Sequence, residues 1–279
     1  MTRLFAVLGH PVSHSLSPAM HQAAFRALKL DAVYTAVDTP PASLRPILKA
    51  LALAGVDGLN VTVPLKEAVI PLLDRVEMRA RAIGAVNTIV IRGRRTTGHN
   101  TDGAGLLQAL RELGWRPRAG EAVLLGAGGA SRAAAWELSR IRGLRLTIAN
   151  RRPERARGLA QWLRRQRPGA RVEAVPLRRA PVRTAQLLIN ATTLGMKPSD
   201  PLPIDPSKLQ RGAVVYDLVY HRQTRLVNAA RRRGCVAANG LSMLLYQGAE
   251  SFRLWTGRRP PLDAMRRALI RAIRDDYFV

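Results

Sequence analysis

Cysteine, lysine and long apolar runs are all scarce in this chain of 279 residues. Cys235 is the only cysteine, so no internal disulfide can form, and a reducing cytoplasm is the expected compartment. The apolar run before Gly9 is too short for the core of a secretion signal. No uninterrupted apolar stretch approaches the length that crosses a membrane. We therefore expect a cytoplasmic protein without a membrane partner.

Acidic residues are also few, 19 against 45 basic ones, which leaves a net charge of +26. A nucleic-acid binder is one interpretation of such a charge. Against it, the arginines are spread along the whole chain, and no zinc-finger spacing, basic zipper or RNA-binding aromatic motif is present. We interpret the charge as a bias toward arginine at solvated positions, and expect neither a specific nucleic-acid partner nor a metal site.

Only five of the 45 basic residues are lysines, and one of them ends the stretch NVTVPLK, residues 60–66. A lysine can lose its proton where its surroundings lower its pKa, whereas an arginine effectively cannot. Proton exchange would explain why Lys66 is not an arginine. A solvated surface charge is the simpler alternative.

Apolar periodicity predicts an α/β protein. In residues 1–102, strand patterns at 2–9, 32–38 and 58–64 are mixed with helical ones, and two strands meet at a turn around Gly93. Ser17 and Pro18 are typical of an N-cap followed by proline at the first helical position. From 103 onward strands alternate with helices, which indicates a parallel sheet covered on both faces. Two helical segments follow Gly240, the second over 262–278.

A glycine-rich turn, GAGGAS at 126–131, follows the apolar strand AVLL and precedes a helix. Such a turn lets backbone N–H groups approach a pyrophosphate at the helix N-terminus. The next strand ends in Asn150-Arg151-Arg152, with Arg155 one turn into the following helix. NAD sites usually carry a carboxylate there, about twenty residues on, whereas a guanidinium binds a 2′-phosphate. The pattern therefore favours NADP (NADPH) over NAD.

Four short polar stretches lie beside expected strand ends: SHSLSP at 13–18, NVTVPLK at 60–66, AVNT at 85–88 and NTDG at 100–103. Singly, each has a structural explanation as a helix cap, a strand residue or a turn. Together with GAGGA, NRR, NAT, YDLVY and GLSMLLYQGA, and in this order, they resemble the shikimate dehydrogenase family along nearly the whole chain.

The resemblance implies two α/β domains. One is a substrate-binding catalytic domain of residues 1–102 plus 241–279, onto which the C-terminal helices pack back. The other is a Rossmann-like, parallel-sheet NADP-binding domain of residues 103–240, with the active site between the two.

The resemblance also implies roles for individual residues. Lys66 and Asp102 would form the catalytic acid/base pair. The remaining roles are substrate binding by Ser15, Ser17, Thr62, Asn87, Tyr220 and Gln247, and cofactor binding by Gly126, Gly128, Gly129, Ala130, Asn150, Arg151, Arg155, Gly240 and Met243. The chain departs from the family pattern after Tyr220, where Tyr-Asn-Pro with threonine five residues on is usual. Here the proline is missing and Thr224 comes one residue earlier. Arg152 also stands where the family has threonine.

The implied reaction is the reversible reduction of 3-dehydroshikimate to shikimate by NADPH, in the biosynthesis of aromatic amino acids. One alternative is a relative that uses NAD and quinate. A second is methylenetetrahydrofolate dehydrogenase, which would place tyrosine where Thr62 precedes Lys66. A third is a binding protein without turnover, for which Lys66 and Asp102 have no evident use. Oligomeric state is left open, a homodimer being one option.

Overall fold

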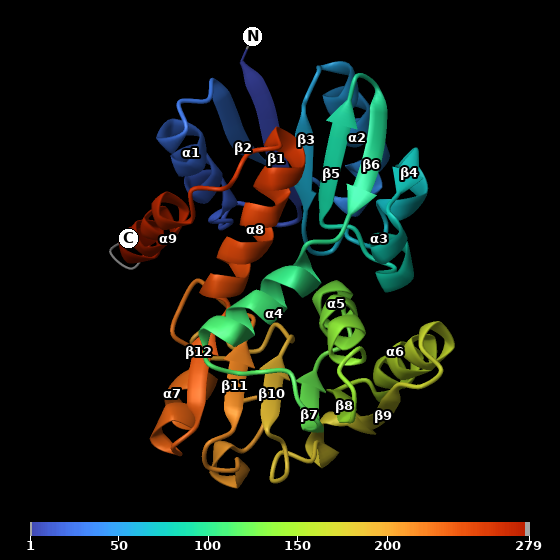
Figure 1. Ribbon diagram of the computed structural model, residues 1–279, viewed down its shortest axis with the longest axis vertical. Coiled ribbons are helices and arrows are strands. Elements are labelled where there is room, and N and C mark those ends of the chain that lie inside the picture. The colour runs from blue at the N-terminus through green and yellow to red at the C-terminus, as the bar shows by residue number, and fades with distance from the viewer. Residues whose placement is uncertain (1, 277–279) are drawn as a thin grey trace. The chain divides into compact units, whose positions relative to one another are not determined.

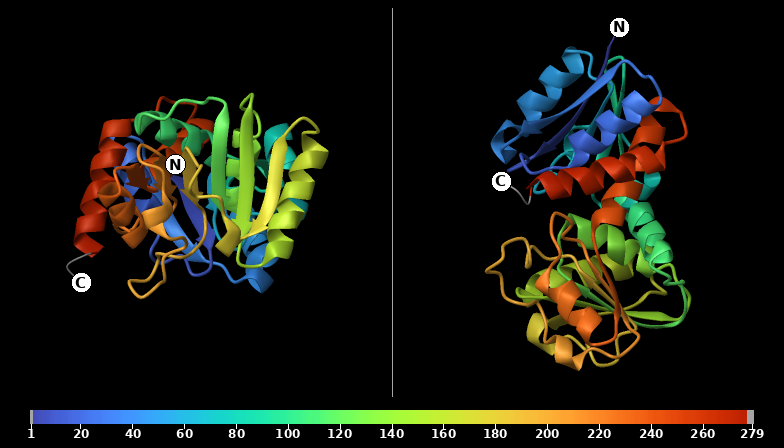
Figure 2. Two further views of the ribbon diagram at one scale, coloured as in Figure 1. Left: turned by 90° about the horizontal axis from the view of Figure 1, so that it is seen from below. Right: turned by 90° about the vertical axis from the view of Figure 1, so that its left-hand side faces the viewer.

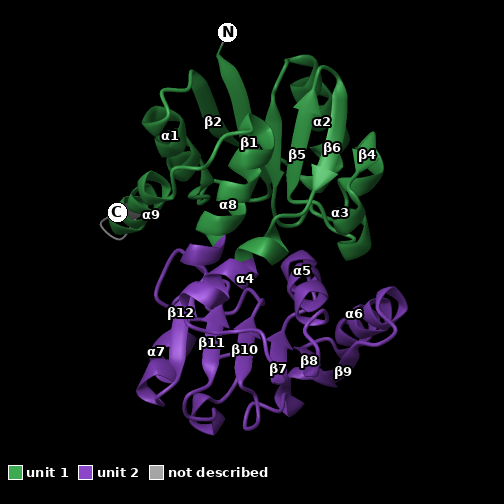
Figure 3. Ribbon diagram, viewed as in Figure 1, with its two compact units in different colours: residues 1–105, 244–279 green, residues 106–243 purple. Residues whose placement is uncertain are grey.

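The computed structural model describes residues 2–276 and divides the chain into two compact units. Unit 1 comprises residues 1–105 and 244–279, and unit 2 comprises residues 106–243 (Figure 3). Within residues 2–276, no helix is long and apolar enough to span a membrane. The helix expected over 262–278 ends at Asp276, and its last two residues lie outside the described part of the chain.

Unit 1 is built on a mixed six-stranded sheet, in the order β2-β1-β3-β5-β6-β4 (Figure 1). Strands β1, β2 and β3 are parallel, and β5 and β6 form an antiparallel pair beside them. The strands are β1 (Arg3–Gly9), β2 (Ala32–Asp38), β3 (Gly58–Val61), β4 (Arg75–Val76), β5 (Thr88–Arg92) and β6 (Arg95–His99). The hairpin expected around Gly93 is confirmed, because Gly93 has a φ of 59° between β5 and β6.

The helices of unit 1 are α1 (Ser17–Ala27), α2 (Leu44–Leu53), α3 (Met78–Ile83) and α9 (Leu262–Asp276), together with most of α8 (Leu241–Thr256). Alternate side chains of β1 face opposite ways, as in any strand. Ala6 and Leu8 pack with Leu44 and Leu48 of α2 in one core. On the other face Phe5 contacts Phe25 of α1. The sheet therefore has helices on both faces.

Trp255 packs against the face of the sheet that carries Phe5, and so joins the end of the chain to unit 1. Its ring centroid lies 5.1 Å from that of Phe5, and its indole Nε1 donates to the Ile89 carbonyl at 2.9 Å. A Cβ at Gly58 would lie 2.3 Å from the indole, so only glycine lets the ring approach β3. The expected return of the C-terminal helices to the first unit is confirmed.

Unit 2 holds six parallel strands in the order β12-β11-β10-β7-β8-β9. Renumbered from β7, this is the 3-2-1-4-5-6 order of doubly wound dinucleotide-binding folds. The strands are β7 (Gly120–Leu125), β8 (Leu144–Asn150), β9 (Arg171–Pro176), β10 (Leu187–Asn190), β11 (Val214–Asp217) and β12 (Val236–Asn239). The parallel sheet expected from the strand–helix alternation is confirmed.

The helices of unit 2 are α5 (Gly129–Leu138), α6 (Pro153–Gln166) and α7 (Arg225–Arg232), together with most of α4 (Asp102–Glu112). Connections through α5 and α6 step along the sheet one way from β7, and the connection through α7 steps the other way. Because parallel crossovers are right-handed, the two sets lie on opposite faces of the sheet, as Figure 2 shows.

Candidate active site

Lys66 and Asp102 form a short ion pair in unit 1. Lys66 lies in the loop after β3, and Asp102 is the first residue of α4, where the helix dipole favours a carboxylate. Lys66 Nζ donates to Asp102 Oδ2 at 2.6 Å, and the side chains are only 13% and 4% exposed. Water therefore screens the attraction between the ammonium and the carboxylate poorly.

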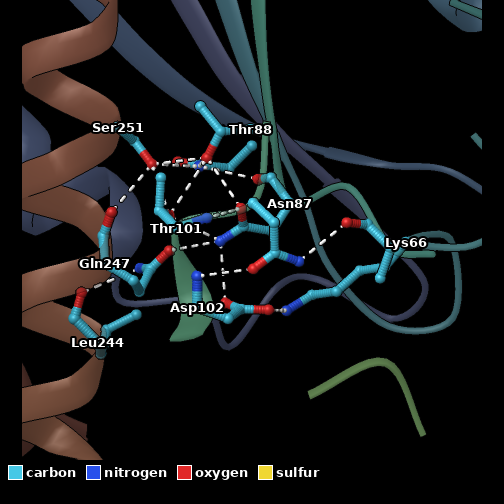
Figure 4. A network of polar contacts seen from close by, with 11 residues as sticks. Lys66, Asn87, Thr88, Thr101, Asp102, Leu244, Gln247 and Ser251 are labelled. Atoms are coloured by element: carbon cyan, nitrogen blue, oxygen red, sulfur yellow. Dashed lines mark hydrogen bonds and ion pairs between the residues drawn. The ribbon is translucent and has the colours of Figure 1, made fainter. Parts of the chain in front are cut away.

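Asn87 holds the other oxygen of the Asp102 carboxylate. Its Nδ2 donates to Asp102 Oδ1 at 2.9 Å and also lies 2.8 Å from Thr101 Oγ1 (Figure 4). The Thr101 backbone N–H donates to Asn87 Oδ1 at 2.8 Å, which fixes the amide so that Nδ2 faces Asp102. Both carboxylate oxygens of Asp102 thus have a separate partner.

Gln247 approaches the same cluster from α8. Its Oε1 accepts from Asn87 Nδ2 at 3.2 Å, and its Nε2 donates to the Leu244 carbonyl at 2.9 Å. The next residue, Gly248, packs against Met20 and His21 of α1. Lys66, Asn87, Asp102 and Gln247, which are widely separated in sequence, are therefore brought together.

Ser15, Ser17 and Thr62 lie at the ends of neighbouring elements of unit 1. Ser17 is buried and is the first residue of α1, while Leu16 is the N-cap residue, so the predicted cap at Ser17 is wrong by one position. Pro18 takes the second helical position, and the Ser17 N–H is satisfied by Ser15 Oγ at 3.3 Å. Thr62 follows β3, which ends at Val61 rather than continuing to residue 64. None of these three side chains is hydrogen-bonded to the Asn87 cluster among the described residues.

The glycine-rich turn of unit 2 joins β7 to α5. Gly126 has a φ of 110°, and a Cβ there would meet the Ala191 carbonyl at 2.7 Å, so both conformation and space require glycine. Gly128 caps α5, which begins with Gly129 and Ala130, and no atom lies within 4 Å of a Cβ built on Gly128. The turn presents a bare backbone at a helix N-terminus.

The end of β8 and the first turn of α6 carry three exposed guanidinium groups and one exposed carboxylate, that of Glu154. Arg151, Arg152 and Arg155 are all exposed, and Asn150 Nδ2 donates to the Arg152 carbonyl at 3.1 Å. Arg152 is the N-cap residue of α6, and its carbonyl also accepts from the Arg155 N–H. A cationic surface therefore lies one strand away from the glycine turn, where a 2′-phosphate would need it.

Tyr220, Gly240 and Met243 belong to unit 2 and lie near the ends of β11 and β12. Tyr220 is half-buried, and burial raises the pKa of its hydroxyl. The shortened segment after it is held at both ends. Asn239 Nδ2 donates to the carbonyls of Tyr220 and Arg222, and Thr224 caps α7.

The Met243 N–H donates to Tyr216 Oη at 3.0 Å, and Gly240 lies so close to the Leu218 carbonyl that a Cβ would not fit.

Beneath the Asn87 cluster lies a second, fully buried polar group to which residue types alone assigned no role. It consists of Asn60, Thr88, Thr101 and Ser251. Three of these residues lie inside the polar stretches singled out above. Ser251 lies between Glu250 and Phe252 in α8, and its only signal is that it follows Gln247 by one helical turn.

Two features define the chemical class. The doubly wound sheet with its glycine turn is that of a dinucleotide-binding unit. The poorly exposed Lys66–Asp102 pair is suited to proton transfer at a reacting oxygen. Together they favour a pyridine-nucleotide-linked oxidoreductase.

Comparison with known proteins agrees with this class. A family profile described as the shikimate dehydrogenase substrate binding domain matches residues 7–89, and one described as the shikimate 5′-dehydrogenase C-terminal domain matches residues 240–270. Shikimate dehydrogenase (NADP(+)) from Moorella thermoacetica is 48% identical over 98% of this chain and 94% of its own. The chain belongs to the shikimate dehydrogenase family.

Solved structures give the same result. Shikimate 5-dehydrogenase from Thermus thermophilus, in complex with NADP(H) and shikimate, is 44% identical with a TM-score of 0.87, covering 97% of this chain and 100% of its own. Quinate dehydrogenase from Corynebacterium glutamicum, in complex with NAD, is 34% identical with a TM-score of 0.88, covering 97% of this chain and 99% of its own.

Proposed function

We propose that this protein is an NADP-dependent shikimate dehydrogenase that reversibly reduces 3-dehydroshikimate to shikimate in the biosynthesis of aromatic amino acids. The observation that carries the proposal is the Lys66–Asp102 pair, whose second carboxylate oxygen is held by Asn87. Shikimate dehydrogenase (NADP(+)) is also the name of relatives that are 47 to 48% identical to the chain.

Lys66 is the acid and base of the reaction. In the reduction its ammonium donates a proton to the oxygen that becomes the new hydroxyl, and in the oxidation its neutral amine accepts that proton. Asp102 orients Lys66 Nζ through the 2.6 Å hydrogen bond, and Asn87 keeps the carboxylate from rotating. Arginine at position 66 would keep the charge but could not exchange the proton.

The substrate is a small polyhydroxylated acid, and the side chains proposed to bind it are hydroxyls and amides that match its groups. Ser15 and Ser17 hold the carboxylate through their hydroxyls, and Asn87 and Gln247 hold ring hydroxyls. Thr62 and Tyr220 complete the set. We propose residues 1–102 with 241–279 as the substrate-binding domain and residues 103–240 as the NADP-binding domain.

The cofactor residues are compatible with a dinucleotide. We propose that the backbone of Gly126, Gly128, Gly129 and Ala130 binds the pyrophosphate. Gly126 fits the turn only without a Cβ, which would meet the Ala191 carbonyl, and Gly128 has open space beside it. Asn150 and the exposed Arg151 and Arg155 hold the adenosine ribose and its 2′-phosphate, with Gly240 and Met243 beside the nicotinamide. When bound, NADPH supplies the hydride.

A cytoplasmic location, expected from the single cysteine, remains a prediction, as does the possibility of a homodimer.

The test is an assay of the purified protein by absorbance at about 340 nm, where reduced nicotinamide absorbs. NADP and NAD are each combined with shikimate and with quinate. We expect turnover with shikimate and NADP above the other three combinations. Preference for quinate and NAD would instead make the protein a functional relative of the quinate dehydrogenase. No turnover in any combination would contradict the proposed function.

A further inference from the structure

Ser251 is completely buried in α8, and its hydroxyl contacts two strands of unit 1 and the preceding turn of its own helix. Ser251 Oγ lies 2.7 Å from Thr88 Oγ1 of β5 (Figure 4). It also lies 3.1 Å from Asn60 Nδ2 of β3. It donates to the Gln247 carbonyl, one turn earlier in the same helix, at 3.0 Å. The hydroxyl therefore connects the helix that carries Gln247 to the sheet that carries Asn87.

Ser251 Oγ has three hydrogen-bond partners at 3.1 Å or closer. A serine hydroxyl has one hydrogen to donate and two lone pairs to accept with. Ser251 donates to the Gln247 carbonyl and accepts from Asn60 Nδ2. Either hydroxyl can be the donor in the 2.7 Å contact with Thr88, whose hydroxyl also reaches Asn87 Oδ1 at 3.1 Å. Asn60 cannot turn its oxygen toward Ser251 instead, because Tyr34 Oη donates to Asn60 Oδ1 at 2.7 Å. The direction of the bond between Asn60 and Ser251 is thus fixed by Tyr34.

Gln247 and Ser251 occupy the same face of α8, because residues four apart in a helix lie one above the other. Gln247 Oε1 accepts from Asn87 Nδ2, and Asn87 in turn holds Asp102. A shift of this turn of α8 would move Gln247 away from Asn87. The hydrogen bond between Ser251 and Thr88, the residue after Asn87, opposes such a shift.

We propose that Ser251 is a positioning residue for substrate binding, which acts by holding Gln247 at its distance from Asn87. The inference rests on the proposed function, since it assigns Gln247 to the substrate. Ser251 itself is fully buried and does not touch the reacting groups. Its removal should therefore weaken the binding of shikimate and leave the proton transfer by Lys66 intact.

The primary variant is Ser251→Ala. Asn60 Nδ2 retains two other acceptors, the Asn87 carbonyl at 3.0 Å and Thr88 Oγ1 at 3.3 Å, so the fold is expected to survive. We expect the KM for shikimate to rise about fivefold, the equivalent of one neutral hydrogen bond. The kcat and the KM for NADP should stay within about twofold, because Asp102 keeps its bonds to Lys66 and Asn87, and Gln247 is not among the residues proposed to bind the cofactor.

Thr256→Ala is the matched control. Thr256 lies on the same helix, and its hydroxyl donates to the Phe252 carbonyl at 2.8 Å in the same backbone geometry. It has no hydrogen bond to the buried polar group among the described residues. We expect no change in the KM for shikimate. An equal rise in both variants would overturn the proposal, because a general loosening of α8 would then explain it.

A double-mutant cycle tests whether Ser251 acts through Gln247. In a Gln247→Ala background, Ser251→Ala should change the KM for shikimate by less than about twofold, because the residue to be positioned is already gone. A fivefold rise that persists in this background would overturn the proposal, as would an unchanged KM in the single variant. The wild-type assay comes first. A wild-type protein that does not turn over shikimate would refute the proposed function and this inference together. An active wild type whose KM for shikimate is unchanged by Ser251→Ala would refute the inference alone.

Discussion

At the scale of single residues, the feature that sets Lys66 apart is its surroundings. Its side chain is 13% exposed and is paired with the nearly buried carboxylate of Asp102. Most other basic residues of the chain are arginines. A guanidinium would satisfy Asp102 equally well as a charge. What it cannot do is give up a proton and take it back near neutral pH.

Lys66→Arg should therefore lower kcat by about a hundredfold or more, the usual scale for loss of a general acid–base. The KM for shikimate should change much less, because the ion pair with Asp102 can still form. Steady-state rates with shikimate and NADP measure both constants. Lys49→Arg, the same exchange at an exposed position of α2, is the control and should be neutral. Near-normal turnover by Lys66→Arg would return Lys66 to the role of a simple charge.

Arg155→Ala should raise the KM for NADPH far more than the KM for NADH, because only NADPH carries the 2′-phosphate that the guanidinium is proposed to hold. Arg157→Ala removes another exposed charge of α6. Its position, two residues on, faces the opposite side of the helix, so neither cofactor should be affected. If the two cofactors suffered alike in Arg155→Ala, the assignment of the 2′-phosphate site would be wrong.

At the scale of elements, sequence patterns located the long strands and helices but not their ends. Ser17 has the composition of an N-cap, yet Leu16 occupies that position and Ser15 satisfies the N–H of Ser17 instead. Periodicity does not reveal β12, because four residues are too few to show alternation, or α7, whose apolar positions lie in an arginine-rich segment. Local sequence does not determine which neighbouring group accepts a hydrogen bond from the free backbone N–H groups at the start of a helix.

The start of α7 depends on one threonine. Thr224 Oγ1 accepts from the Val227 N–H and donates to Asp217 Oδ2 at 2.7 Å. Asp217 is fully buried, and although burial raises the pKa of its carboxyl, hydrogen bonds from Thr224, Val219 and Asn190 oppose the rise. Without the threonine hydroxyl, both the cap and one of these bonds are lost.

Thr224→Val should lower the free energy of unfolding of unit 2 by about 2 to 3 kcal/mol, the sum expected for a cap and a hydrogen bond to a carboxyl group. Urea unfolding followed by circular dichroism measures the loss. Thr224→Ser keeps the hydroxyl and should retain most of the stability. Equal losses in the two variants would show that the threonine methyl group, rather than the hydroxyl, is what matters.

At the scale of the whole molecule, the sequence predicts unit 2 better than unit 1. Regular alternation of strands and helices leads to a parallel sheet, and that sheet is present. The mixed sheet of unit 1 depends on the pairing of β3 with β5 and of β4 with β6, which no local pattern specifies. The candidate site follows the same rule. The family resemblance named Lys66, Asp102 and Gln247, whereas the support from Asn60 and Ser251 arises only when α8 meets the sheet.

The stability of unit 1 should depend on pH through His21. This histidine is fully buried, stacks on Tyr34 with ring centroids 4.5 Å apart, and has no hydrogen-bond partner for either ring nitrogen among the described residues. Burial lowers its pKa from 6.5 to about 3. Because the folded-state pKa lies below the unfolded one, the stability is complete above pH 6.5 and is lost progressively as the pH falls toward 3.

His21→Phe keeps the aromatic stack and removes the titration. Relative to this variant, the wild type should lose about 2 kcal/mol of unfolding free energy between about pH 7.5 and about pH 5. Urea unfolding of both proteins at the two pH values gives the difference. His14→Ala, at an exposed histidine, serves as the control for the loss of an ordinary imidazole. A difference between wild type and His21→Phe that does not change with pH would contradict the prediction.

Trp255 also has a consequence for how the protein is made. Its ring completes the core of unit 1 against Phe5 and Gly58, yet it is synthesised after all of unit 2. On the ribosome, the middle of the chain is therefore the first part that can fold to completion, and the N-terminal strands must wait with one face covered by α1 but not yet by Trp255. At ordinary translation rates the wait is roughly 10 to 30 s. A nascent chain stalled just before Trp255 would carry Lys66, Asp102 and Gln247, but would still expose the apolar face that chaperones recognise.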